Sequence, residues 1–204
     1  PEANLQLKNS TQCFNSAAWC QNGKVMQIFR KKLLPTYDVF DEARYFSAGE
    51  SPFSIVHKGK HVAVTICEDI WNVDSDLHAN NPLSLIASEK PDLLINLSAS
   101  PWYLGKQELR LSILKKAVKL VDCPICYVNS VGGNDELIFD GKSVLMDSNG
   151  QVLHQAKSFE ESIEVHDLND KPKHNFLSNI AEESLQKGLT LGIRDYVQKT
   201  GFKK

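Results

Sequence analysis

Long hydrophobic runs are absent from this sequence of 204 residues. No apolar stretch approaches the roughly 20 residues of a membrane-spanning helix, so we expect no membrane partner. The first residues, Pro1-Glu2-Ala3-Asn4, contain no Met, no basic region and no apolar region, so no signal peptide is expected. The missing Met predicts that the chain is a piece of something longer.

An excess of one charge is absent too, since 23 Lys and Arg against 25 Asp and Glu give a net charge of −2. A protein that binds nucleic acid through a basic surface is therefore not expected. The five cysteines are an odd number in a chain too long to need a disulfide framework, which favours a reducing, cytoplasmic location. With 42% hydrophobic and 24% charged residues, the composition is that of a globular domain.

Short apolar stretches alternate with helical patterns along the chain. Near-continuous apolar runs predict strands at 61–66, 92–97 and 125–130, of the kind found in a sheet covered on both faces. Apolar residues at 109, 113, 117 and 120, widened by 114, 118 and 121, predict a helix over 106–121, and a shorter helix is predicted over 82–89. Residues 142–146 and 151–156 read as a hairpin around an Asn-Gly turn. This order indicates an α/β layered domain.

The composition becomes polar at 159–179, which we interpret as an exposed exit segment or linker. A further helix is predicted over 180–199, with Gly201 in the position of a C-cap glycine.

Cys67 stands where an apolar strand ends, which is where α/β proteins present a nucleophile to a crevice. The alternative is a buried, inert cysteine. The neighbouring Glu68 and Asp69 raise the pKa of a thiol, so a cation is needed if the thiolate is to form.

Two further segments combine residues that suit chemistry. Residues 31–46 mix cations, acids and aromatics without a helical or strand period, and a lysine there could polarise a carbonyl oxygen. Residues 96–106 place hydroxyl groups at a strand end and Lys106 at a helix start, which suits a polar ligand. The alternatives are a surface loop with ordinary ion pairs and plain turn or capping chemistry, respectively.

In this order the segments resemble the nitrilase (carbon–nitrogen hydrolase) superfamily, and more closely the glutaminase domain of glutamine-dependent NAD+ synthetases. The resemblance rests on Lys-x-x-Leu-Pro-x-Tyr-x-Val-Phe-Asp-Glu-x-Arg-Tyr-Phe at 31–46 and Ile-Cys-Glu-Asp-Ile-Trp at 66–71. It continues through 98–106 and 127–143, and 193–202 looks like the lead-in to the synthetase domain. It covers nearly the whole chain and implies a nitrilase-like α-β-β-α sandwich, truncated at its N-terminus.

The resemblance implies that a Glu-Lys-Cys triad hydrolyses the side-chain amide of L-glutamine. Cys67 matches the nucleophile, and Lys31 rather than Lys32 matches the lysine because it stands three residues before Leu34. Glu42 matches a second glutamate that orients the lysine. The residues that match substrate-binding positions, or suit the substrate's charged groups, are Tyr37, Glu68, Ser100 and Lys106.

Two parts of the family pattern are not found. The general-base glutamate lies well upstream of the lysine in the family, whereas Glu2 is the only acid before Lys31, so the base is expected to be absent. The phosphate loop of the synthetase domain is not found either. ATP, Mg2+ and deamido-NAD+ are therefore expected to bind in a missing synthetase domain, with no cofactor in this chain.

The resemblance divides the chain into three parts: the hydrolase domain at 1–158 without its first strand–helix unit, the exit segment at 159–179, and the start of the synthetase domain at 180–204. A homo-oligomer is expected. Two alternatives stay open: a stand-alone amidase of the superfamily, and an incomplete fragment that acts only as a structural subunit.

Other signals favour structure over chemistry. Cys123 and Cys126 have the spacing of redox or zinc motifs but no second pair. The histidines at 57, 61, 78, 154, 166 and 174 show no helical i, i+4 pair, so no metal site is expected. Gly132-Gly133 is interpreted as a tight turn.

Overall fold

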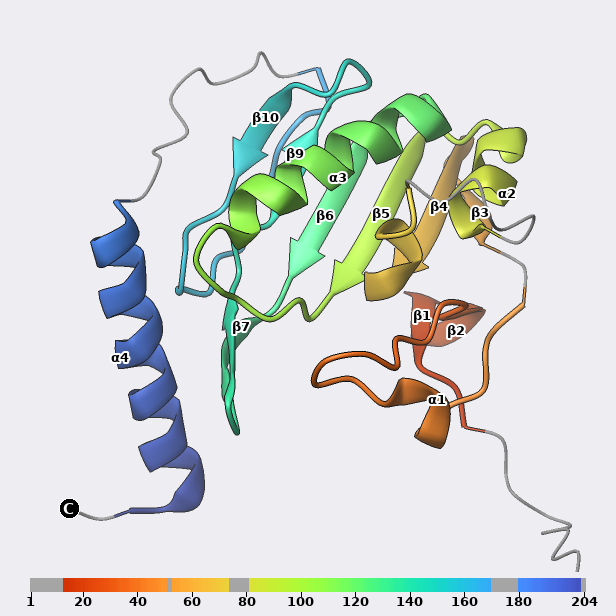
Figure 1. The fold of residues 1–204 in the computed structure, drawn as a ribbon. Coiled ribbons are helices and arrows are strands. Elements are labelled where there is room, and N and C mark those ends of the chain that lie inside the picture. The colour runs from red at the N-terminus through yellow and green to blue at the C-terminus, as the bar shows by residue number, and fades with distance from the viewer. Residues whose placement is uncertain (1–12, 51–52, 74–80, 170–179, 203–204) are drawn as a thin grey trace, which may run out of the picture.

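A six-stranded mixed sheet forms the centre of the computed structural model, which describes residues 13–50, 53–73, 81–169 and 180–202 (Figure 1). Its strand order is β10-β9-β6-β5-β4-β3. The adjacent strands β4, β5 and β6 are parallel, and their neighbours on either side, β3 and β9, are antiparallel to them. The bounds are β3 Ser54–His57, β4 Lys60–Ile66, β5 Leu93–Ser98, β6 Ile125–Asn129, β9 Val144–Met146 and β10 Val152–Gln155. The predicted strands and the 142–156 hairpin are confirmed.

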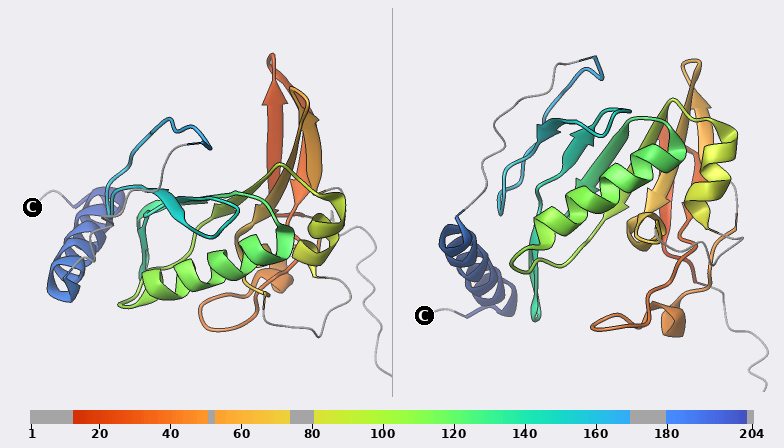
Figure 2. Two further views of the ribbon diagram at one scale, coloured as in Figure 1. Left: turned by 90° about the horizontal axis from the view of Figure 1, so that it is seen from above. Right: turned by 45° about the horizontal axis from the view of Figure 1, so that its top comes forward.

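Two helices cover one face of this sheet, α2 (Pro82–Glu89) and α3 (Lys106–Val121), with the bounds that the sequence predicts (Figure 2). The Asn81 side chain caps α2 by accepting a hydrogen bond from the Leu83 N–H at 3.0 Å. The buried side of α3 carries Ile113, Leu114, Ala117, Val118 and Val121. Leu109 and Leu120, which the apolar stripe included, are instead 43% and 38% exposed.

The opposite face of the sheet is covered only in part by the described residues. The hairpin of β1 (Ser16–Gln21) and β2 (Lys24–Arg30) packs near β4. The side chains of β4 from residue 62 to residue 66 are buried on both faces of the sheet. On β5 and β6, Leu97 and Val128 are 38% and 42% exposed. The expectation of a sheet covered on both faces therefore holds over β4, whereas the described residues leave β5 and β6 partly uncovered on this face.

A second hairpin, of β7 (Val131–Asn134) and β8 (Leu137–Asp140), extends from the end of β6. The interpretation of Gly132-Gly133 as a tight turn is wrong, because both glycines lie in β7. They are needed for close approach: a Cβ on Gly133 would lie 3.1 Å from the Cα of Gly192. The Gly133 N–H also donates to the Asp195 carboxylate at 2.8 Å.

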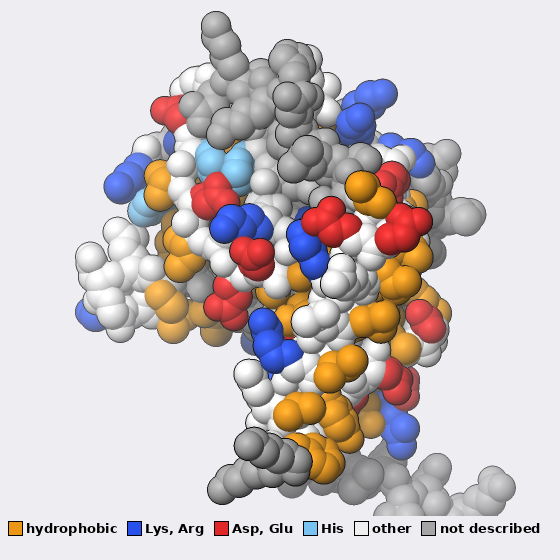
Figure 3. Space-filling model, turned by 90° about the vertical axis from the view of Figure 1, so that its left-hand side faces the viewer, with side chains coloured by type: hydrophobic (Ala, Val, Ile, Leu, Met, Phe, Trp, Pro, Cys, Tyr) orange, Lys and Arg blue, Asp and Glu red, His pale blue; other side chains and the backbone are white. Residues whose placement is uncertain are grey.

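These contacts dock the C-terminal helix α4 (Ala181–Thr200) against β7 and β8, and Gly201 ends it with a φ of +74° as expected. The outer face of α4 is apolar, as Figure 3 shows, and carries Leu185, Leu189, Ile193 and Tyr196, which are 42–67% exposed. Among the described residues, no helix is both long enough and apolar enough to span a membrane.

Gly188→Ala is expected to destabilise the protein, although replacing Gly by Ala inside a helix normally stabilises it by about 0.5–1 kcal/mol. The added Cβ would lie 2.7 Å from the Trp102 ring and push α4 away from it. The measurement is the free energy of unfolding in urea. Thr190→Ala, on the exposed side of the same helix, is the control and should show no loss. A stabilised Gly188→Ala protein would contradict this packing.

Candidate active site

Cys67 lies at a sharp turn between strand β4 and the short 3-10 helix η1 (Cys67–Ile70). Its φ is +45°, a left-handed conformation that costs energy in a residue with a Cβ and that is often retained at functional sites. The turn projects the half-buried thiol from the carboxyl end of a parallel strand, the edge at which α/β sheets bind ligands.

The Asp69 carboxylate connects this turn to the segment that carries Lys31. One oxygen accepts the N–H groups of Lys32 and Leu33 at 3.0 and 2.8 Å, and the other accepts the N–H of Ile66 at 3.0 Å. Asp69 is 1% exposed. A buried carboxylate with three donors fixes two distant segments against each other, a role that the sequence around Cys67 does not predict.

Lys31 and Glu42 form a buried ion pair, and both charges act on the Cys67 thiol. The Lys31 Nζ lies 2.5 Å from the Glu42 Oε1, and their side chains are 0% and 19% exposed. Glu42 comes from the short helix α1 (Glu42–Tyr45). Lys32, by contrast, lies over the Phe53 ring, so the structure brings the predicted lysine, and not its neighbour, into this pair.

The environment of Cys67 favours the neutral thiol in the resting protein. Burial raises the pKa of the thiol, and the Lys31 charge and a hydrogen bond from the Ala99 backbone only partly oppose this. The charges of Glu68 and Glu42 raise the pKa further. A thiol held in this way must lose its proton to a base when it reacts.

Cys67 opens into a cavity of about 310 Å³, within the range of small-molecule sites. The cavity brings together Cys67 and all four predicted substrate-binding residues. Its lining is Tyr37, Asp38, Phe40, Cys67, Glu68, Trp71, Ser100, Pro101, Tyr103, Lys106 and Leu109.

The cavity wall carries an acidic group, Glu68, and a basic group, Lys106. The Tyr37 hydroxyl lies 2.9 Å from both carboxylate oxygens of Glu68, and burial together with this carboxylate raises the pKa of Tyr37. Burial also raises the pKa of Glu68. The Lys106 Nζ lies 4.1 Å from the centre of the Trp71 ring and 4.9 Å from that of Tyr103, and burial lowers its pKa. A zwitterionic ligand fits such a wall.

A buried polar network fixes the backbone of Ser100. The Ser100 N–H donates to the Asn129 Oδ1 at 2.9 Å, and the Asn129 amide in turn contacts Asp140. Asp140 pairs with Arg110 at 3.0 Å, and both side chains are at most 1% exposed. No pattern in the sequence pointed to these partners, since they come from β6, β8 and α3 and meet only in the fold.

Asp69 gives the stability of the protein a specific pH dependence. Burial raises its pKa from 3.8 to about 6 despite the three N–H donors. Because the folded chain holds this proton more tightly than the unfolded chain, the resulting stability is full below about pH 4 and is lost as the pH rises through about 6. Relative to Asp69→Asn, the unmodified protein should lose roughly 2–3 kcal/mol of unfolding free energy between pH 4 and 7. Urea titrations at several pH values measure this, and a difference that is constant with pH would contradict it.

Comparison with known proteins gives consistent relatives. The sequence model of the carbon-nitrogen hydrolase family matches residues 2–171 of this chain. The glutamine-dependent NAD(+) synthetase of Synechocystis sp. is 37% identical over 214 residues, which cover 100% of this chain and 38% of the relative. That of Thermotoga maritima is 34% identical and covers 97% and 40%, respectively. The chain therefore spans about two fifths of the length of these relatives.

Solved structures show the same similarity. The glutamine-dependent NAD+ synthetase from Acinetobacter baumannii, in complex with ADP, has a TM-score of 0.82 and 35% identity over 94% of this chain and 36% of its own. A carbon-nitrogen hydrolase from Helicobacter pylori G27 has a TM-score of 0.64 at 22% identity over 76% of this chain and 56% of its own, a similarity of fold.

Proposed function

Since this chain belongs to the carbon–nitrogen hydrolase family, we propose that it hydrolyses the side-chain amide of glutamine within a glutamine-dependent NAD+ synthetase. The observation that carries the proposal is the cavity lined by Cys67, whose thiol is influenced by the charges of the buried Lys31–Glu42 pair. The ammonia then serves the ATP-dependent amidation of deamido-NAD+ in a synthetase domain beyond this chain.

The reaction proceeds through a thioester. The Cys67 sulfur attacks the amide carbon as its proton passes to a base, and the carbonyl oxygen becomes an oxyanion stabilised by Lys31 and the N–H of Glu68. The C–N bond then breaks, and ammonia leaves with a proton returned by the base. Water attacks the thioester, the C–S bond breaks, and glutamate and the thiol are released. In the family the base is a glutamate upstream of the lysine. Here the only acid upstream is Glu2, outside the described residues.

The cavity wall provides both ends of an amino-acid clamp. Lys106 binds the substrate α-carboxylate, and Glu68, held by Tyr37, binds the α-ammonium. Ser100 contributes polar contacts beside the thiol. Each residue lines the same cavity as Cys67, which is the arrangement that a short zwitterionic substrate requires.

Lys106→Met is expected to raise the KM for glutamine roughly 10- to 100-fold with a much smaller change in kcat, because a hydrogen bond to a charged group is worth about 1.5–3 kcal/mol. Lys106→Arg should retain much of the affinity, since Arg pairs well with carboxylates. Lys115→Met, on the exposed side of α3, is the matched control. Steady-state glutamate release by the full-length protein is the measurement. An unchanged KM would remove Lys106 from the binding site.

We also propose a cytoplasmic location, a homo-oligomeric state, and binding of ATP and Mg2+ by the synthetase domain. In the described part of the chain, Cys13, Cys20, Cys67, Cys123 and Cys126 form no disulfide, which suits a reducing compartment. The exposed apolar groups on the open sheet face suit an assembly. Glutamine-dependent NAD+ formation tests the whole proposal, and a full-length protein that releases no glutamate from glutamine would refute it.

A further inference from the structure

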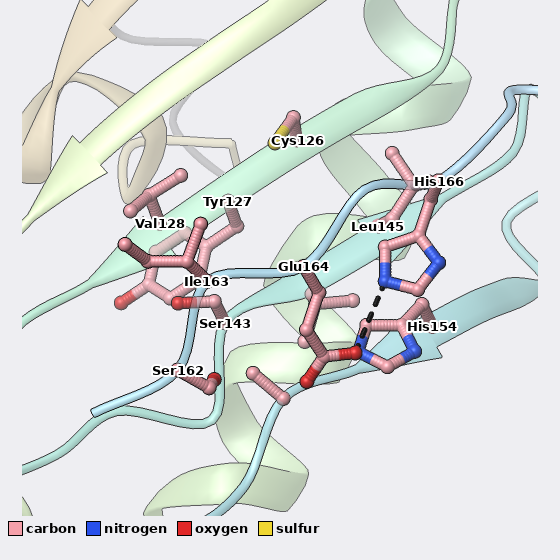
Figure 4. Close-up of a pocket in the computed structure, with 12 residues that line it drawn as sticks. Cys126, Tyr127, Val128, Ser143, Leu145, His154, Ser162, Ile163, Glu164 and His166 are labelled. Atoms are coloured by element: carbon pink, nitrogen blue, oxygen red, sulfur yellow. Dashed lines mark hydrogen bonds and ion pairs between the residues drawn. The ribbon is translucent and has the colours of Figure 1, made fainter. Parts of the chain in front are cut away.

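A second cavity, of about 250 Å³, lies on the sheet face away from α3 and shares no lining residue with the cavity at Cys67 (Figure 4). It is formed by β6, β9 and β10 and by the chain that follows β10. Its lining is Cys126, Tyr127, Val128, Ser143, Val144, Leu145, His154, Ala156, Ser162, Ile163, Glu164 and His166. The proposed function makes no use of it.

Two elements bring a carboxylate and two imidazoles together at this cavity. His154 lies on β10, where the pairing with β9 shifts register between Val152 and His154, an irregularity that re-aims a side chain. Glu164 and His166 come from the segment after β10. The residue between them, Val165, is 96% exposed, so alternate side chains of this segment point in opposite directions. Glu164 and His166 therefore share the side that faces His154 (Figure 4).

The three donor atoms lie at distances close to those of a metal site. The Glu164 Oε2 is 2.7 Å from the Nε2 of His154 and 3.2 Å from that of His166, and one donor atom from each residue lies within 4.8 Å of the others. Tetrahedral Zn2+ with ligands at about 2.0–2.1 Å separates its donors by about 3.3 Å. Both carboxylate–imidazole distances lie on the short side of this spacing, and the His χ2 torsions, which are broad, allow the rings to rotate.

The chemistry and exposure of the group also fit a metal ion. Two imidazole nitrogens and one carboxylate oxygen are a ligand set that Zn2+ accepts, with a fourth position for water. The side chains of His154, Glu164 and His166 are 17%, 36% and 20% exposed, so the group is shielded and yet open to an ion. The two rings are stacked with centroids 3.7 Å apart, which restricts their freedom before binding.

We propose that His154, Glu164 and His166 bind one divalent transition-metal ion, with Zn2+ as the ion of choice. The ion joins the segment after β10 to the edge of the six-stranded sheet. The i, i+4 test applied to the sequence did not detect this site because the two histidines are brought together across elements, 12 positions apart.

Zn2+ titration of the full-length protein tests the proposal, by calorimetry and by metal analysis after dialysis. The unmodified protein should bind one equivalent, and Glu164→Gln or His166→Ala should weaken this binding at least 10-fold. His57→Gln and Glu161→Gln are matched controls that should bind as the unmodified protein does. All are made in a Cys67→Ala background, which removes the thiol of the proposed nucleophile as a competing ligand.

Substitution with Co2+ provides a second readout that does not depend on affinity alone. The visible spectrum should be that of a four-coordinate nitrogen and oxygen site and should be lost in His166→Ala. Zn2+ should also slow proteolysis within 156–168 in the controls but not in the ligand variants. Equal Zn2+ binding by ligand and control variants, or a thiolate-type Co2+ spectrum unchanged by His166→Ala, would overturn the proposal. Because Glu164 is exposed, its variant is informative even if the His154 position tolerates no change.

Discussion

Cys67→Ala should lower glutamine hydrolysis by the full-length protein by about 10⁴-fold or more, because no other group can form the glutamyl thioester. Synthesis of NAD+ from added ammonia should persist, since the synthetase domain then receives its nitrogen directly. The measurements are glutamate release and NAD+ formation with each nitrogen source. Mass spectrometry after an acid quench should find the glutamyl adduct on Cys67 in the unmodified protein.

Cys126→Ala is the matched control for this loss. Cys126 is also partly buried and lies on β6 of the same sheet, but it lines the other cavity. Its replacement should leave glutaminase activity in place. Similar glutaminase rates in Cys67→Ala and the unmodified protein would refute the assignment of the nucleophile and with it the proposed thioester.

Lys31→Met is expected to lower kcat by roughly 10²- to 10³-fold with little change in KM, because loss of one oxyanion donor costs about 2.7–4 kcal/mol. The Lys31 side chain is completely buried against Glu42 and does not line the cavity, so in the proposed role it acts on the oxyanion and makes little contact with the rest of the substrate. A raised KM with an unchanged kcat would make Lys31 a binding residue only.

Measuring the free energy of unfolding beside kcat separates the contribution of Lys31 to stability from its proposed role in catalysis. Lys31→Met leaves the Glu42 carboxylate without its cation, and breaking a buried pair costs about 3–5 kcal/mol, with the 19% exposure of Glu42 favouring the lower end. In the double variant Lys31→Met/Glu42→Gln the unpaired charge is gone, so most of the unfolding free energy should return while kcat stays low. Lys32→Met is the neighbouring control. Recovery of activity in the double variant would contradict the oxyanion role.

The elements that the sequence predicted well are those whose local pattern and tertiary environment agree. The apolar run of β4 is buried inside the sheet, and most of the periodic stripe of α3 faces the same core. The β1–β2 hairpin was missed although Asn22-Gly23, a strong turn signal, stands at its tip with φ values of +51° and +72°. The interpretation of Gly132 and Gly133 as a turn is wrong because these positions need glycine for the close approach of α4. A contact with a distant helix cannot be predicted from the local sequence.

In the candidate site, too, the residues that match a sequence motif could be predicted, and those that depend on tertiary contacts could not. The resemblance predicts roles for Cys67, Lys31, Glu42 and four further residues. The fold pairs Lys31 with Glu42 and places Cys67 and the four further residues around one cavity. The partners that fix them could not be predicted. Asp69 binds backbone N–H groups 36 and 37 positions away, and any sequence provides such donors. The pairing of His154 with His166 depends likewise on where one extended segment returns to the sheet.

The raised pKa of the Cys67 thiol has a consequence for the durability of the protein. Peroxide oxidises thiolates far faster than thiols, so a nucleophile that stays protonated until it reacts is a poor target for oxidants. Cys13 and Cys20 are exposed and are therefore more accessible to an oxidant than Cys67 is. The same burial that makes the proposed nucleophile dependent on a base should thus also slow its oxidation by peroxide.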